Sequence, residues 1–212
     1  MKNNRRKEII ISTSVCLLPI LAGFALYGRL PETIATHFEA NGEADGWSSR
    51  AFTVFGLPAL MAGVNLLVLF ALNTDPKKKN MNPTLRAFAI WTVPVLSVFM
   101  SALTLGNALG YPMHIDIVVP LLVGLLLIVV GNYLPKTKQS YTMGIKLPWT
   151  LASEENWNRT HRIAGCLWVI GGILMVLLAL LRIWILWAVI ALALLLVLVP
   201  SVYSFLLYRK GI

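Results

Sequence analysis

The chain has 212 residues, of which 58% are hydrophobic and only 13% are charged, and its formal net charge at pH 7 is +9. A soluble domain has roughly 25% charged residues, so this chain has too little polar surface for a water-soluble fold, and lipid is its expected solvent. The basic residues flank apolar stretches and do not alternate with aromatic residues. This pattern indicates anchoring at a bilayer and argues against direct binding of nucleic acid.

Six apolar stretches are each close to the roughly 20 residues that a helix needs to cross a bilayer. In chain order they cover residues 9–28, 52–72, 87–109, 117–130, 163–181 and 183–208. The fourth is short unless Tyr133 and Leu134 lie in the interface, and the last two are joined by a tight turn at Arg182. The first follows a basic N-terminus, as in a signal peptide, but no small-residue cleavage site comes after it. We therefore expect this first stretch to remain as a span.

The Lys and Arg residues predict how these spans are oriented. With the N-terminus inside the cell, 15 of the 18 basic residues lie in inner segments, and only Arg29, Arg50 and Arg182 lie outside. Inner segments of membrane proteins carry an excess of Lys and Arg. The sequence thus predicts an all-α fold, a polytopic transmembrane helical bundle of about six spans in the plasma membrane, with the N and C termini cytoplasmic.

This orientation divides the chain into segments. They are a cytoplasmic N-terminus (1–8), a first helical pair (9–72) with an outer loop (29–51), an inner basic loop (73–86), a second helical pair (87–131), an inner structured loop (132–162), and a third helical pair with the cytoplasmic C-terminus (163–212). Loops 29–51 and 132–162 are too long to be simple turns. Because the spans of a bundle mostly pack against one another, we expect function in these two loops.

The outer loop is acidic and contains two turn dipeptides, Asn41-Gly42 and Asp45-Gly46. Its candidate functional residues are His37, Phe38, Glu39, Gly42, Asp45 and Trp47. Two interpretations are open: a short hairpin-like loop with a solvated acidic face, or a docking surface with aromatic anchors for something outside the cell. The histidine and carboxylates contain metal-binding atoms, but their spacing matches no strong metal motif, and no metal is predicted.

The inner loop has candidate residues that belong either to structure or to partner binding. They are Asn132, Gly144, Lys146, Pro148, Trp149, Thr150, Glu154, Trp157, His161 and Arg162. Thr150 is expected to cap a helix with Glu154 and Glu155 in its first turns, and this helix is expected to continue into the fifth span. Trp157 and His161 are four residues apart and share one helix face. The loop is either an aromatic belt at the lipid headgroups or a surface that recruits a cytoplasmic partner.

The spans contain few groups with chemical function. Asn65 lies near the middle of the second span and is predicted to bond to a neighbouring helix. Small residues four apart, Ala59 with Gly63 and Ala102 with Gly106, predict faces of close helix packing. No charged residue lies at mid-membrane, which argues against a proton-coupled transporter.

Catalytic and redox chemistry find little support in the sequence. It contains no nucleophile elbow, nucleotide-binding loop or pair of intramembrane aspartates, so no catalytic residue and no cofactor is predicted. Cys16 and Cys166, the two cysteines, both lie within apolar stretches. We interpret them as small buried hydrophobic residues, with a disulfide as the less supported alternative.

Two motifs, one in each long loop, carry a family resemblance. The first consists of Leu30-Pro31, His37-Phe38, Gly42, Asp45 and Trp47. The second consists of Gly131-Asn132, the run 144–151, Glu154, Trp157, Thr160-His161-Arg162 and Gly165. Together with the span count, they resemble the SdpI family of bacterial membrane immunity proteins over nearly the whole chain, including its small N-terminal domain of unknown function. Lys146 and Leu147 depart from that pattern, where arginine and threonine are common, and lysine lacks the bidentate fork of arginine.

The resemblance implies immunity to a secreted peptide toxin that attacks the producer's own membrane. It also implies signalling, in which toxin engagement lets the immunity protein hold a cytoplasmic transcriptional repressor at the membrane. Three functional hypotheses follow: a non-enzymatic immunity protein or receptor, a small-molecule or peptide transporter, and a membrane enzyme using His161 or His37. The resemblance favours the first.

Overall fold

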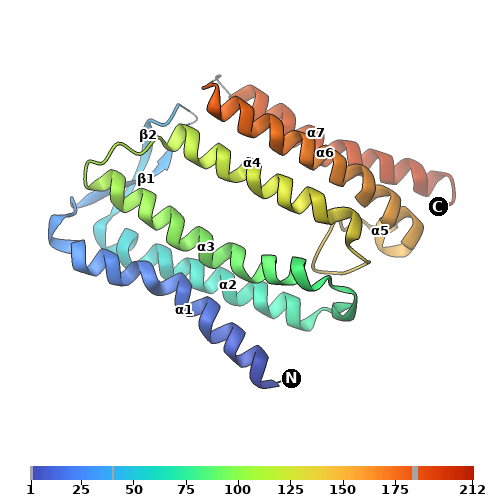
Figure 1. Cartoon of the computed structure of the whole chain (residues 1–212), viewed down its shortest axis with the longest axis horizontal. Coiled ribbons are helices and arrows are strands. Elements are labelled where there is room, and N and C mark those ends of the chain that lie inside the picture. The colour runs from blue at the N-terminus through green and yellow to red at the C-terminus, as the bar shows by residue number, and fades with distance from the viewer. Residues whose placement is uncertain (1, 40, 183–185) are drawn as a thin grey trace. The chain divides into compact units, whose positions relative to one another are not determined.

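The computed structural model describes residues 2–39, 41–182 and 186–212 (Figure 1). The described residues form seven α-helices and one two-stranded sheet, so the fold is mostly helical rather than all-α as predicted. Six of these helices are long and apolar enough to cross a membrane, which makes the chain a multi-pass membrane protein. The chain divides into two compact units, residues 1–73 with 86–115, and residues 74–85 with 116–212.

The long helices of the first unit follow the first three predicted spans. They are α1 (Lys2–Leu26), α2 (Leu57–Thr74) and α3 (Pro83–Ala108), and a π-helical turn (Phe52–Gly56) leads into α2. Asn65 on α2 donates from Nδ2 to Ser12 Oγ on α1 at 3.1 Å, which confirms the predicted bond between helices. At the start of α3, Arg86 forms two hydrogen bonds of 3.0 and 2.8 Å with the carboxylate of Glu8.

A β-hairpin joins α1 to α2, which confirms the hairpin-like shape predicted for loop 29–51. Strands β1 (Thr33–Phe38) and β2 (Ala44–Ser49) pair antiparallel, with Ile34 opposite Ser48 and Ala35 opposite Trp47. The register shifts near His37, as in a β-bulge. One hairpin face is fixed in the unit by a small apolar cluster made of Leu30, Ile34, Val54 and Leu105.

The second unit contains α4 (Ile115–Tyr133), α5 (Pro148–Ala152), α6 (Glu154–Leu180) and α7 (Leu186–Arg209). Helix α4 includes Tyr133, so it is longer than the stretch from which the fourth span was predicted. Helix α6 continues without a break from the inner loop into the fifth span, as expected. The predicted start of the sixth span at residue 183 lies outside the described residues.

Glycine pairs bring the backbones of α4 and α6 into contact. A Cβ added at Gly172 would lie 2.6 Å from the carbonyl oxygen of Gly124, and one at Gly165 would lie 2.7 Å from that of Gly131. Such close backbone approach is typical of small residues between membrane helices. A Cβ at Gly63 would meet nothing within 4 Å, so the packing face predicted through that residue is wrong.

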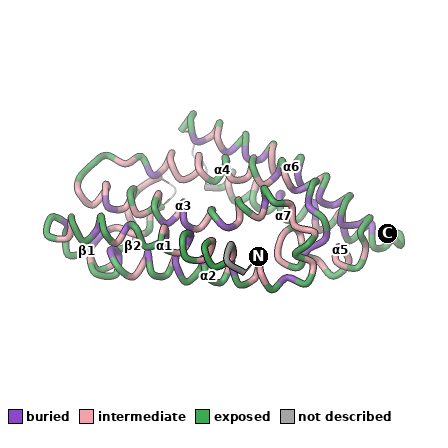
Figure 2. Tube along the Cα trace, turned by 60° about the horizontal axis from the view of Figure 1, so that its bottom comes forward, coloured by how far each residue is buried: buried purple, intermediate pink, exposed green. Residues whose placement is uncertain are grey.

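Along the helices, short buried segments are separated by intermediate and exposed ones (Figure 2). Many of the exposed residues are large and apolar. On α1, for example, Leu21 and Phe24 are about two-thirds exposed, while Cys16 is fully buried. Cys166 is exposed, contrary to the prediction that both cysteines are buried. Exposed leucine and phenylalanine along a long helix are favourable where the surrounding solvent is hydrocarbon.

Candidate functional site

The tip of the hairpin is ordered by short-range polar contacts. His37 Nδ1 and Asp45 Oδ1 lie 2.6 Å apart, and the backbone N–H of Glu43 donates to the Asn41 side chain at 2.9 Å. Gly42 has a φ of +85°, a left-handed conformation that glycine adopts without a side-chain clash. The sequence-predicted residues His37, Gly42 and Asp45 therefore shape the turn.

Trp47 and Glu39 are exposed on the hairpin, and Phe38 is half-buried. Trp47 is 60% exposed and pairs with Ala35, whereas the neighbouring pair of Ile34 and Ser48 includes the buried isoleucine. Successive side chains of a strand point to opposite faces, so Trp47 lies on the face turned away from the apolar cluster. An exposed tryptophan of this kind is available to a partner.

Arg50 fastens the hairpin to the end of α1, a role that the sequence analysis missed. Its Nη1 donates to the carbonyl oxygens of Tyr27 and Leu30 at 3.1 and 2.9 Å. Its guanidinium also lies over the Tyr27 ring, 4.5 Å from the centroid. The hairpin thus starts from a fixed base even though its tip is exposed.

In the second unit, the buried carboxylate of Asp75 organises the inner loop. Asp75 Oδ2 accepts hydrogen bonds from Ser140 Oγ at 2.7 Å and from the backbone N–H groups of Tyr141 and Thr142 at 3.0 and 2.9 Å. Burial acts to raise the pKa of Asp75, but hydrogen bonds from Ser140, Thr142 and the Lys77 backbone outweigh it, and the pKa is lowered. Asp75 is therefore held as a carboxylate, and segment 74–85 is tied to the loop that follows α4.

Gln139 extends this connection to α5. Its Nε2 donates to the carbonyl oxygen of Thr150 at 2.9 Å, and its Oε1 accepts from Lys77 Nζ at 2.6 Å. Its backbone carbonyl accepts from Asn80 Nδ2 at 3.1 Å. The loops predicted at 73–86 and 132–162 therefore meet at one end of the second unit, although neither Asp75 nor Gln139 was predicted as a site residue.

Trp157 and His161 are the buried centre of the loop, and Gly144 lies against both rings; these three residues are called the inner cluster. The two rings stack with centroids 4.0 Å apart, as expected for neighbours on one helix face. Trp157 Nε1 donates to the Thr137 carbonyl at 2.8 Å. His161 Nε2 accepts the Ile145 N–H at 2.9 Å, and its Nδ1 lies 2.7 Å from the Trp157 carbonyl. This pair of partners requires the neutral tautomer that is protonated at Nδ1.

Thr150 organises the turn before α5 rather than the start of α6. Its Oγ1 lies 2.9 Å from the Ile145 carbonyl, to which it donates, and accepts the Leu147 N–H at 2.9 Å. The N-cap of α6 is Ser153, whose side chain accepts from the Asn156 N–H. The prediction that Thr150 caps this helix is therefore wrong, because Thr150 lies within the short helix α5, which ends before Ser153.

Aromatic and amide contacts join this region to the C-terminal helix. Trp149 packs edge-on against Phe205 and stacks on Tyr208, with centroids 5.4 and 6.0 Å apart. Asn156 Nδ2 donates to the carbonyls of Ser204 and Ile212 at 3.0 and 3.1 Å. The C-terminus thus lies at the same end of the second unit as the inner loop.

The remaining predicted residues of the inner loop lie at its surface and outside the buried centre. Asn132, Lys146, Pro148, Glu154 and Arg162 are all exposed. Lys146 Nζ donates to the Thr142 carbonyl at 3.2 Å, which is a bond within the loop. The predicted residues of the inner loop therefore fall into two groups: residues whose contacts hold the loop together, and residues that are exposed to solvent.

His161 is poorly placed for acid–base catalysis. Both ring nitrogens of His161 are engaged in hydrogen bonds, and the ring is fully buried. A general acid or base must reach the proton that it transfers. Among the described residues, no group of three or more His, Cys, Asp and Glu side chains is placed to hold a metal ion.

Comparisons with known proteins match both loops. The model of the SdpI/YfhL protein family matches residues 136–204, which include the inner cluster, and that of a domain of unknown function (DUF1648) matches residues 15–62, which include the hairpin. The chain is 30% identical over 205 residues to "Immunity protein SdpI" of Bacillus subtilis (strain 168), covering 96% of this chain and 97% of that protein. No solved structure matches.

Proposed function

Because the chain belongs to the SdpI/YfhL protein family, we propose that it is a plasma-membrane immunity protein that protects its cell from a secreted, SDP-like antimicrobial peptide. The observation that carries this proposal is the identity to an immunity protein over nearly the full length of both chains. Six helices that can cross a membrane support this proposal, because the proposed peptide attacks a membrane. The proposed role is non-catalytic.

The hairpin is the proposed toxin-facing surface. It presents His37, Phe38, Glu39, Gly42, Asp45 and Trp47. The exposed Trp47 is an anchor for an apolar segment, and the carboxylates favour a positively charged one. The fixed base at Arg50 supports this role, because a surface that is ordered before binding loses less entropy on contact.

The inner cluster is the proposed surface for signalling, with the N and C termini on the same, cytoplasmic side. The buried bonds around Asp75 and His161 would hold the exposed loop residues in one arrangement. Exposed Lys146 and Arg162 would give that surface a positive charge. A cytoplasmic transcriptional repressor is the proposed partner, which the membrane protein would sequester after toxin engagement.

Two alternatives are a small-molecule or peptide transporter and a membrane enzyme. The sequence places no charged residue at mid-span, where a proton-coupled transporter would carry one. The buried and fully bonded His161 does not favour an acid–base role, and His37 is paired with Asp45 at an exposed turn. Neither alternative gains a specific observation from the described residues.

Protection in cells tests the proposal. A strain that is sensitive to the SDP-like peptide and lacks its own immunity protein is made to express this chain, with the Bacillus subtilis protein as positive control. We expect survival in the presence of the peptide, and loss of survival for Trp47→Ala at unchanged membrane abundance. Trp187→Ala is the matched control, because Trp187 is 79% exposed but lies on α7. Normal insertion without protection would contradict immunity to this peptide.

A further inference from the structure

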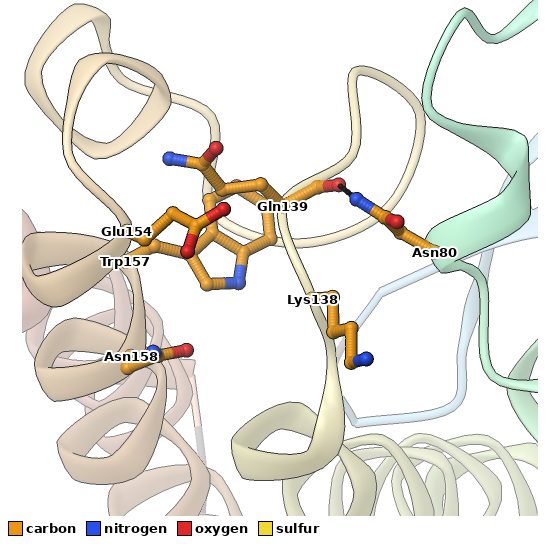
Figure 3. Close-up of a pocket in the computed structure, with 6 residues that line it drawn as sticks. All are labelled: Asn80, Lys138, Gln139, Glu154, Trp157 and Asn158. Carbon is orange, nitrogen blue, oxygen red and sulfur yellow. Dashed lines mark hydrogen bonds between the residues drawn. The ribbon is translucent and has the colours of Figure 1, made fainter.

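A cavity of about 340 Å³ lies beside the inner cluster (Figure 3). It is lined by Asn80, Lys138, Gln139, Glu154, Trp157 and Asn158. Three segments of the second unit contribute these residues: segment 74–85, the loop after α4, and the first turns of α6. Its size falls in the range of pockets that hold small ligands.

Two of the lining side chains already have their polar atoms engaged. Gln139 uses its amide on Thr150 and Lys77, and Trp157 uses its indole N–H on Thr137. Both side chains are buried. They therefore form a fixed wall of the cavity, and a ligand must be recognised by the other lining groups.

The other lining groups include one cation and one anion that are not paired with each other. Among the described residues, Lys138 and Glu154 form no ion pair, because the pairs present are those of His37, Arg86 and Arg159. Glu154 and Asn158 are four residues apart on α6, so both lie on the helix face that lines the cavity. Lys138 comes from a different segment, the loop after α4.

This arrangement of charge is complementary to a dipolar ligand. A purely anionic ligand would be repelled by Glu154, and a purely cationic one by Lys138, while a ligand with both charges can satisfy both side chains. The amide of Asn158 can donate to an anionic group or accept from an ammonium group. Asn80 keeps its amide oxygen for the ligand, since its Nδ2 is bonded to the Gln139 carbonyl.

We propose that this cavity binds a compact zwitterion, with an ammonium group against Glu154 and an anionic oxygen group against Lys138. Two sources share this chemistry: a free amino-acid-like molecule, and the phosphoethanolamine headgroup of a membrane lipid. A bound zwitterion joins α6 to segment 74–85 and the loop after α4, the parts that Asp75 and Gln139 also connect. The proposal concerns a site separate from the hairpin and does not depend on toxin immunity.

Calorimetric titration of the purified full-length protein in detergent micelles tests the proposal. The probes are β-alanine and phosphoethanolamine as zwitterions, with propionate, inorganic phosphate and ethylammonium as probes of one charge. We expect at least one zwitterion to bind about tenfold more tightly than any probe of one charge. Glu154→Gln and Lys138→Met should each weaken that binding about tenfold. Glu155→Gln and Lys136→Met, neighbours in the sequence that do not line the cavity, should leave it unchanged.

The two sources are separated by repeating the titration in nanodiscs with and without phosphatidylethanolamine. If the lipid headgroup is the ligand, its presence in the disc abolishes binding of the free zwitterion. If a free molecule is the ligand, both discs give the same affinity. Equal affinity for probes of one charge, no binding of either zwitterion up to about 10 mM, or unchanged binding by the Glu154 and Lys138 variants would overturn the proposal. Circular dichroism of each variant checks that its helices are intact.

Discussion

Gly144 lies directly against the ring of His161: a Cβ at residue 144 would be 2.5 Å from His161 Nε2, the atom that accepts the Ile145 N–H. The same Cβ would also lie 2.7 Å from the Trp157 ring. Gly144 further has a φ of +102°, in the region that side chains rarely adopt. Two independent constraints, space and backbone conformation, therefore require glycine at the centre of the inner loop.

Gly144→Ala should destabilise the protein because the methyl group must displace either the histidine or the backbone of its own turn. The expected loss is about 3 kcal/mol, from backbone strain together with overpacking. Thermal unfolding of the purified protein in detergent measures it as a lower Tm. Gly63→Ala is the control, since a Cβ there meets nothing within 4 Å. Equal unfolding temperatures for the two variants would contradict the packing described around His161.

The carboxylate of Asp75 makes the inner loop sensitive to acid. Its pKa lies below the ordinary value of 3.8, so the folded protein binds this proton less readily than the unfolded chain does. The stabilisation is therefore fully present above the unfolded pKa and is lost as the pH falls through the lower, folded pKa. Limited proteolysis of the inner loop should accelerate below about pH 4, while at neutral pH the loop should stay protected.

Asp75→Asn isolates the contribution of this carboxylate to the pH dependence from the contributions of the other acidic groups. The amide keeps one oxygen acceptor but replaces the charged acceptor of the Ser140, Tyr141 and Thr142 bonds, at a cost of about 2 kcal/mol at neutral pH. The variant should also lose the part of the pH dependence that comes from the inner loop. An unchanged acid profile in the variant would show that another group governs the loop.

The contact between α4 and α6 makes two adjacent glycines respond differently to the same substitution. At Gly172 a Cβ would lie 2.6 Å from a backbone oxygen of α4, which cannot move without shifting the helix. At Gly171 it would lie 3.0 Å from the end of the flexible Leu192 side chain. Gly172→Ala should therefore be less stable than Gly171→Ala by about 2 kcal/mol, measured by thermal unfolding in detergent. Equal stability would mean that the two helix backbones are not in contact.

Hydropathy was sufficient to predict the long helices, since a span needs only length and apolar composition. The fourth span looked short because Asn132 and Tyr133 are less apolar, yet α4 extends through both before Leu134 and Pro135. The hairpin was also predictable, because Asn41-Gly42 is a local turn signal. These features depend on residues near one another in the sequence.

The polar centre of the inner loop depends on contacts between distant residues, and most of it was not predicted. Asp75 and Ser140 are 65 positions apart, so neither periodicity nor spacing indicates that they meet. Asp75 precedes Pro76 in the segment predicted as an inner basic loop, where nothing nearby in the sequence indicates a partner after α4. Trp157 and His161 were predicted to be neighbours because a helix fixes that relationship locally.

The helix contact through glycine was missed for a different reason. Small residues occur at regular spacing in several spans, and spacing alone does not identify which helices meet. Gly124 and Gly131 are seven residues apart, as are Gly165 and Gly172, and two antiparallel helices can match such pairs. That shared spacing is the signal from which the contact could have been predicted.

The proposed function requires the hairpin to lie outside the cell and the inner cluster to lie within it, which a labelling measurement tests directly. Glu43→Cys and Lys146→Cys are made separately in a chain whose Cys16 and Cys166 are replaced by alanine, and intact cells are treated with a membrane-impermeant maleimide. Both positions are exposed, so accessibility depends on the side of the membrane. We predict labelling at residue 43 in intact cells, and at residue 146 only after the membrane is opened. Labelling at 146 but not at 43 in intact cells would contradict this orientation and with it the proposed function.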